Sequence, residues 1–286
     1  MSFPLPVGYR AAEALAFYGR DTEGISESLT ANGFRKCFLS AGKPLVAEIR
    51  FLDGNAEFTV DPGMSEVAEP VVARMLGLHT PSMEFERQFA DDPLLGAVVS
   101  RQRGLCIPMT PTPWEALAWA IMGQQVNLTF ATTLRRNLIL LAGYPHSTGL
   151  RAHPDAAQVA ELQPESLRAL KFSRSKADYL IGAAKAVASG EVDLDGLAAM
   201  PMDEAAAKLL QLRGVGPWTV QYAFMRGLGF QDCLPAGDAG LAQGLDKLTG
   251  SRPTEAQIRS MMAKYSPYRS LATYHVWASL KGAVEG

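Results

Sequence analysis

Residues 212–219, with the sequence LRGVGPWT, constrain the folding of this chain more than any other stretch. Gly214 and Gly216 flank a valine, and a proline follows at once. Glycine tolerates positive φ, and proline is favoured at the first position of a helix. We therefore expect a helix over residues 205–213, a tight hairpin over 214–216 and a second helix over 217–229. The free backbone N–H groups at the start of that second helix make a candidate phosphate site, although a plain helix-turn-helix corner is the alternative.

Length and composition describe an ordinary globular chain. It has 286 residues, of which 48% are hydrophobic and 20% are charged, enough for one large domain or two. No apolar run reaches the ~20 residues of a membrane span, and the N-terminus lacks the pattern of a secretory signal. We therefore expect a cytoplasmic protein that does not associate with membranes, with a monomer as the default.

The cysteines are three and far apart in the sequence, at Cys37, Cys106 and Cys233. This spacing predicts no disulfide framework and no zinc site. It also excludes the group of four cysteines that would hold an iron–sulfur cluster.

Charge is distributed unevenly along the chain. Residues 1–92 carry 8 Lys and Arg against 14 Asp and Glu, a net charge of −6, whereas residues 93–286 carry 19 against 15, a net charge of +4. The basic excess therefore lies in the part that contains the hairpin. This is a mild signal for a nucleic-acid partner.

The pattern of hydrophobic residues predicts an α+β fold with two parts. In residues 1–92, a helix over 11–18 and short strands over 25–30, 34–39, 45–51 and 56–60, joined by turns, precede a helix over 64–78. Residues 93–286 read as an all-α array of two helical subdomains, in which Thr112 and Asn127 are expected to cap helices over 113–125 and 128–141. Further helices are expected over residues 155–161, 164–170, 173–188, 217–229, 238–248, 254–264 and 269–281.

The hairpin pattern, the apolar helix after it and the sequence LPAGDAGL at residues 234–241 together resemble the helix-hairpin-helix DNA glycosylases. Within that superfamily the chain is most similar to the bacterial 3-methyladenine DNA glycosylase II (AlkA-like) group, over most of its length from about residue 104. The resemblance implies an enzyme that flips an alkylated base, such as 3-methyladenine or 7-methylguanine, out of double-stranded DNA. It implies hydrolysis of the N-glycosidic bond in base excision repair, without a cofactor.

Asp238 stands where this family carries its catalytic aspartate. Breaking an N-glycosidic bond builds positive charge on the sugar, and a carboxylate can stabilise that charge or orient the attacking water. Taken from the residues alone, a role only as the N-cap of the helix that follows is the favoured interpretation of Asp238. The two roles are compatible.

Three aromatic residues match positions that line the base pocket in the 3-methyladenine group: Trp218, Tyr222 and Trp277. Trp218 and Tyr222 are four residues apart and share one helical face, and electron-rich rings attract a cationic base. Packing in the core is the alternative for all three, and we assign Trp114 and Trp119 to the core. Relatives that also cut the strand carry a lysine where this chain has Trp218. The resemblance therefore implies a monofunctional enzyme with water as the nucleophile.

The remaining candidate residues are polar or backbone groups that would contact DNA. The segment IMGQQVN at 121–127 resembles the family segment whose side chains fill the gap left by the flipped base, although Gln125 stands where some members have an apolar wedge. Phosphate contacts are expected from the hairpin. The helix start at residue 173 is a further candidate for phosphate binding, with a solvent-exposed helix start as the alternative. The DNA-binding set is therefore Gln124, Gln125, Arg174, Lys176, Gly214, Val215, Gly216 and Thr219. The carbonyls of Leu210, Leu212 and Val215 are candidates for a monovalent cation, as in relatives.

Two other functions remain open. One is an oxidised-base glycosylase of the same superfamily, against which the missing hairpin lysine counts. The other is a non-catalytic DNA-binding protein in which Asp238 is only a helix cap.

Overall fold

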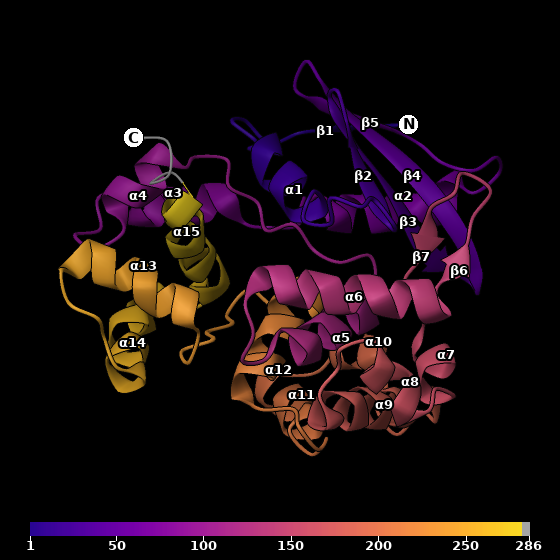
Figure 1. Cartoon of the computed structure of the whole chain (residues 1–286). Helices are drawn as coiled ribbons and strands as arrows, with labels where there is room; N and C mark the ends of the chain where they lie inside the picture. Colours follow the sequence, from indigo (N-terminus) through magenta and orange to yellow (C-terminus); the bar gives the residue numbers. More distant parts are fainter. Residues whose placement is uncertain (282–286) are drawn as a thin grey trace.

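A five-stranded antiparallel sheet forms the N-terminal part of the protein, in a computed structural model that describes residues 1–281. Figure 1 shows this sheet set against a larger body of helices. The sheet adds an edge strand that the sequence did not suggest, since β1 pairs with β5 and sets Phe3 opposite Ala56. The strands, in the spatial order β1-β5-β4-β3-β2, are β1 (Ser2–Pro4), β5 (Asn55–Thr59), β4 (Lys43–Leu52), β3 (Gly33–Ser40) and β2 (Glu27–Thr30).

One face of the sheet packs against helices α1 (Ala11–Tyr18) and α2 (Ser65–Met75). Alternate side chains of β3, such as Phe34 and Phe38, point to this face, as the two-residue period of a strand requires. The other face is partly covered by a short ribbon that the sequence did not predict within the helical part. Its strands are β6 (Tyr144–Pro145) and β7 (Arg151–Ala152), and Ala152 packs against Cys37.

The helices form two groups, which Figure 1 shows on either side of the molecule. The chain passes from the first group to the second and back again. The first group contains α3 (Ser82–Phe89), α4 (Gly96–Arg101), α13 (Ala239–Thr249), α14 (Glu255–Met262) and α15 (Arg269–Lys281). The second contains α5 (Pro113–Gly123), α6 (Leu128–Ala142), α7 (Ala156–Ala160), α8 (Pro164–Ala169), α9 (Arg174–Ala188), α10 (Leu194–Leu197), α11 (Met202–Leu209) and α12 (Pro217–Ala223).

Buried side chains change from one core to the other near residue 80. Leu76 belongs to the core beneath the sheet, whereas Phe85 and Phe89 of α3 pack in the core of the helices. The division into domains at residue 92 stays a prediction, and the packing of α3 favours a boundary about ten residues earlier.

Helix starts follow the capping signals of the sequence. The Thr112 hydroxyl accepts a hydrogen bond from the N–H of Glu115, and the Asn127 side chain accepts one from Phe130. Both caps were predicted. Each satisfies a backbone donor that the helix itself cannot satisfy.

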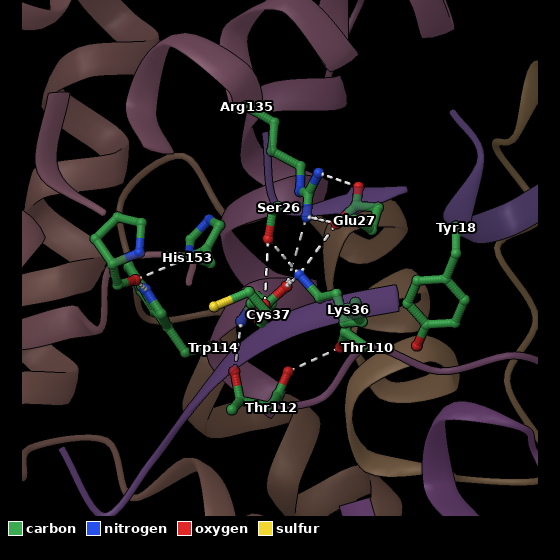
Figure 2. A network of polar contacts seen from close by, with 12 residues as sticks. Tyr18, Ser26, Glu27, Lys36, Cys37, Thr110, Thr112, Trp114, Arg135 and His153 are labelled. Carbon is green, nitrogen blue, oxygen red and sulfur yellow. Dashed lines mark hydrogen bonds and ion pairs between the residues drawn. The ribbon is translucent and has the colours of Figure 1, made fainter. Parts of the chain in front are cut away.

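Buried charges join the sheet to the helices. Lys36 of β3 is fully buried, and its ammonium lies 3.1 Å from Glu27 and 3.3 Å from Glu115 of α5. Arg135 of α6 binds both carboxylate oxygens of Glu27, at 2.6 and 2.8 Å, and Ser26 accepts a further hydrogen bond from Lys36 (Figure 2). Two cations and two carboxylates thus neutralise one another at the interface between the two parts of the chain.

The charges also shift the pKa of Glu27. Burial alone would raise it, but the charges and hydrogen bonds of Arg135 and Lys36 outweigh burial and lower the pKa from its ordinary value of 4.5 to about 2. Because the folded pKa is the lower one, Glu27 stabilises the fold at neutral pH. This contribution falls as the pH drops from about 4 towards 2.

We predict that Lys36→Met destabilises the protein by about 3–5 kcal/mol, because it leaves Glu27 and Glu115 buried with one cation fewer. Arg35→Met, at the next position of β3, removes an exposed pair with Glu48 and is expected to cost less than about 1 kcal/mol. Urea unfolding followed by circular dichroism compares the two. Equal midpoints for both variants would show that the buried network does not stabilise the interface.

Candidate active site

The hairpin lies between α11 and α12, as the sequence predicted, but its helices have different ends. Helix α11 stops at Leu209, and α12 begins at Pro217 and continues as a π-helical turn over Phe224–Leu228. Gly214 has φ +83°, and a Cβ there would lie 2.1 Å from the ring of Tyr179. Gly216 has φ −103° and no atom within 4 Å of a Cβ position. The first glycine is therefore required by the fold, whereas the second leaves the backbone open.

Asp238 is the N-cap of α13, where Oδ1 accepts a hydrogen bond of 2.8 Å from the N–H of Leu241. The expected cap is therefore present. Two indoles bind the same carboxylate: Nε1 of Trp277 donates to Oδ1 at 2.9 Å, and Nε1 of Trp218 donates to Oδ2 at 2.8 Å. The sequence pointed to both tryptophans as ring surfaces only, and it gave no sign of these hydrogen bonds.

The three predicted pocket aromatics form one continuous wall. Trp218 and Tyr222 are stacked with ring centroids 5.5 Å apart, and Tyr222 and Trp277 are 6.3 Å apart. Tyr222 is buried, while both tryptophans are half-buried and face a cavity of about 1390 Å³. These rings are therefore neither free surface side chains nor closed core.

The cavity lies between the two groups of helices. Its walls come from α5 and α12 on one side and from α13 and α15 on the other. Trp119, which the sequence analysis assigned to the core, also lines it. The signal that could have found it is its position four residues before Gly123, on the same helical face as the predicted DNA-facing segment 121–127. Arg20, Arg226 and Tyr274 line the cavity as well, and no motif identified them.

Gln124 and Lys176 are engaged within the protein. The amide of Gln124 donates to the carbonyl of Gly214 and to the hydroxyl of Thr219, both at 2.8 Å, and so ties the end of α5 to the hairpin. The Lys176 ammonium donates to the carbonyl of Gln124 at 2.6 Å, and burial lowers its pKa. These side chains support the loop between α5 and α6.

Gln125 and Arg174 are exposed. Gln125 has φ +55° and lines the mouth of the cavity. Arg174 is the first residue of α9, and the helix is capped by Ser173. Both side chains are free to contact a partner at the surface.

The hairpin carbonyls remain candidates for a cation. The carbonyl of Leu212 accepts a hydrogen bond from Val215 at 3.0 Å, and Leu210 is exposed. Within residues 1–281, no group of three or more His, Cys, Asp or Glu side chains is arranged to hold a metal ion.

The part of the chain that contains the hairpin and Asp238 matches a known protein family. Residues 118–267 match the model of the HhH-GPD superfamily of base excision DNA repair proteins. The chain belongs to this superfamily. The match ends before Trp277 and begins after Arg20, so two residues that line the cavity lie outside it.

Relatives within the superfamily are similar over part or all of the chain. A DNA-3-methyladenine glycosylase of Bacillus subtilis is 32% identical over 194 residues, which are 66% of this chain and 64% of that protein. A 3-methyladenine DNA glycosylase of Archaeoglobus fulgidus has the same fold, with a TM-score of 0.85 at 19% identity and 97% of each chain covered. A Schizosaccharomyces pombe 3-methyladenine DNA glycosylase, solved with abasic DNA, has a TM-score of 0.61 at 23% identity and covers 69% of this chain and 97% of that one.

None of the helices within residues 1–281 is both long enough and apolar enough to cross a membrane.

The two hairpin glycines should differ in their tolerance of a methyl group. We expect Gly214→Ala to lower stability by about 1–3 kcal/mol, because it adds a clash with Tyr179 to an unfavourable φ. Gly216→Ala should stay within about 0.5 kcal/mol of the wild type, because its Cβ meets open space. Thermal unfolding of the two variants side by side makes the comparison. A stable Gly214→Ala would contradict the packing of the hairpin on α9.

Proposed function

We propose that this protein is a monofunctional DNA glycosylase that removes alkylated bases, such as 3-methyladenine and 7-methylguanine, from double-stranded DNA. One observation supports this above all: the Asp238 carboxylate is fixed by three donors beside a wall of stacked aromatic rings. Membership of a superfamily of base excision DNA repair proteins and relatives named 3-methyladenine DNA glycosylases support the same activity. A monomer is the proposed state.

Asp238 is the proposed catalytic residue. As the glycosidic bond breaks, the sugar acquires oxocarbenium character, and the carboxylate stabilises it. Because the cap and both indoles already hold the oxygens, little reorganisation is needed when the charge develops. The carboxylate also orients water for attack on the sugar.

The aromatic wall is the proposed site for the base. A flipped base would stack against Trp218, Tyr222 and Trp277. This stacking offsets part of the free energy of unstacking the base from DNA, which is a few kcal/mol. An alkylated purine that carries positive charge gains a further ~1–2 kcal/mol from cation–π attraction when desolvated.

The proposed DNA-binding surface is the rim of this cavity. The N–H groups after Gly216, at the start of α12, would bind phosphate, with Val215 and Thr219 beside them and a cation on the hairpin carbonyls as a further contact. Gln125, exposed at the mouth, would fill the gap left by the base, and Arg174 would meet the backbone. Gln124 and Lys176 would act by holding this loop rather than by touching DNA.

Water is the proposed nucleophile. Trp218 lies where strand-cutting relatives would carry a lysine, and an indole cannot form a Schiff base. Among the described residues that line the cavity there is no lysine. The expected product is therefore an abasic site in an intact strand.

Asp238→Asn should lower single-turnover release of 3-methyladenine by about 100-fold or more, the range seen when a charged group that stabilises a transition state is lost. The fold should survive because asparagine also caps helices. Asp193→Asn is the matched control, since Asp193 caps α10 in the same way but does not line the cavity. With wild-type enzyme the strand should stay intact until alkali is added. Activity of Asp238→Asn within about threefold of wild type would refute the catalytic assignment.

Gly216→Asp should weaken binding to duplex DNA of any sequence by about tenfold, since a carboxylate close to a phosphate costs on the order of 1–2 kcal/mol. The matched control is Gly182→Asp, at a glycine of α9 that also has open space and lies away from the cavity. Fluorescence anisotropy with two unrelated duplexes measures the effect. Equal affinities for the two variants would remove the hairpin from the interface.

A further inference from the structure

The N-terminal part of the chain contributes a charged side chain to the base cavity. Arg20 follows α1 by two residues and lines the cavity together with Trp119 of α5. Its guanidinium carbon lies 4.5 Å from the centroid of the Phe17 ring and 5.7 Å from that of Trp119. The side chain is therefore held between two rings, one from each part of the protein.

Arg226, from the π-helical turn after α12, places a second guanidinium against the same Phe17 ring. Its guanidinium carbon lies 4.9 Å from that ring, 4.6 Å from Tyr274 and 5.9 Å from Trp277. Arg226 is 2% exposed, and one of its amino groups donates to the carbonyl of Pro108 at 2.6 Å. Its Nε is buried and has no hydrogen-bond partner within residues 1–281. Arg20 and Arg226 therefore both line the cavity next to aromatic rings, Arg20 beside Trp119 and Arg226 beside Trp277. Trp277 is also the residue whose indole binds Asp238.

Arg20 differs from the arginines that hold the fold together. Arg135, Arg136 and Arg269 each bind a carboxylate with at least two hydrogen bonds. Arg20 makes no hydrogen bond or ion pair with any residue that the structure describes. A guanidinium offers five N–H donors and no acceptor. At a half-buried position on a cavity wall, these donors are available to a bound molecule.

We propose that Arg20 is a specificity-determining residue that donates hydrogen bonds to the acceptor edge of the flipped base. This rests on the proposed function of the cavity. The O6 and N7 atoms of a 6-keto purine accept bonds from a guanidinium fork, whereas the 6-amino group of an adenine presents donors to a donor. Arg20 therefore favours a neutral base with a 6-keto oxygen and a free N7, such as hypoxanthine, over 3-methyladenine. The aromatic wall binds the face of the base, and Arg20 reads its edge.

Charge acts in the same direction. Arg20 and Arg226 place two positive charges on this wall, beside the Glu13 carboxylate that binds the Tyr274 hydroxyl, and both guanidiniums repel a formal positive charge on the base. A neutral 6-keto purine suffers no such repulsion. Hypoxanthine should therefore depend on Arg20 more strongly than any cationic base does.

The test compares base release by Arg20→Met and by the wild type in single-turnover reactions. The probes are a duplex with one deoxyinosine and duplex DNA treated with a methylating agent. Arg20→Met keeps an unbranched apolar stem but removes the donors and the charge. We expect the ratio of hypoxanthine to 3-methyladenine release to fall by about tenfold or more, the effect of losing a hydrogen bond to a charged donor.

Two further variants make the result decisive. Arg20→Lys keeps the charge without the fork, so it should lose most of the preference for hypoxanthine, and it carries the test if Arg20→Met does not fold. Arg50→Met, at an exposed arginine of β4 that does not line the cavity, should leave every ratio unchanged. Equal loss for hypoxanthine and 3-methyladenine, or no loss, would overturn the role of Arg20. A wild-type protein that releases no base from either DNA would instead refute the proposed function itself.

Discussion

The carboxylate of Asp238 binds three donors that belong to three different helices. The N–H of Leu241 lies in α13, the indole of Trp218 in α12 and the indole of Trp277 in α15. Because α12 lies in one group of helices and α13 and α15 in the other, these bonds fix the two groups against each other at the mouth of the cavity. An indole N–H reaches the carboxylate only with its ring in the cavity wall. The same two hydrogen bonds therefore set both the position of the Asp238 carboxylate and the placement of the two tryptophan rings in the cavity wall.

The N-terminal sheet is part of this arrangement rather than an appendage. The buried pairs of Lys36 and Arg135 with Glu27 and Glu115 hold it against α5 and α6. Helix α5 also carries Trp119, whose ring contacts Arg20 at the cavity. The ion pairs at this interface thus help to place Arg20, a side chain of the N-terminal part, beside the cavity.

Local signals account for what could be predicted from the sequence. Prediction of the hairpin and of the helix caps needs only neighbours within a few residues, and this holds for Thr112, Asn127 and Asp238. Prediction of the strands needs only the two-residue alternation of their side chains. The bonds from Trp218 and Trp277 to Asp238 join residues 20 and 39 positions apart, and no local pattern encodes such distances. Arg20 was missed for the same reason, since Trp119 is about a hundred residues away in the sequence. Helix α11 ends at Leu209 rather than at the predicted Arg213, and the contact of Gly214 with Tyr179 of α9 is another long-range contact that no local pattern encodes.

The buried charges have a consequence for how the protein is made. Glu27 and Lys36 leave the ribosome early, whereas Glu115 and Arg135 follow only after some eighty to a hundred further residues. Until then the finished strands of the sheet carry a buried ion pair that lacks half of its partners, and one face that lacks its β6–β7 cover. The N-terminal part, although first to be synthesised, therefore cannot reach its final packing before α6 and the ribbon have emerged, and the order of synthesis is not the order in which its stability is gained.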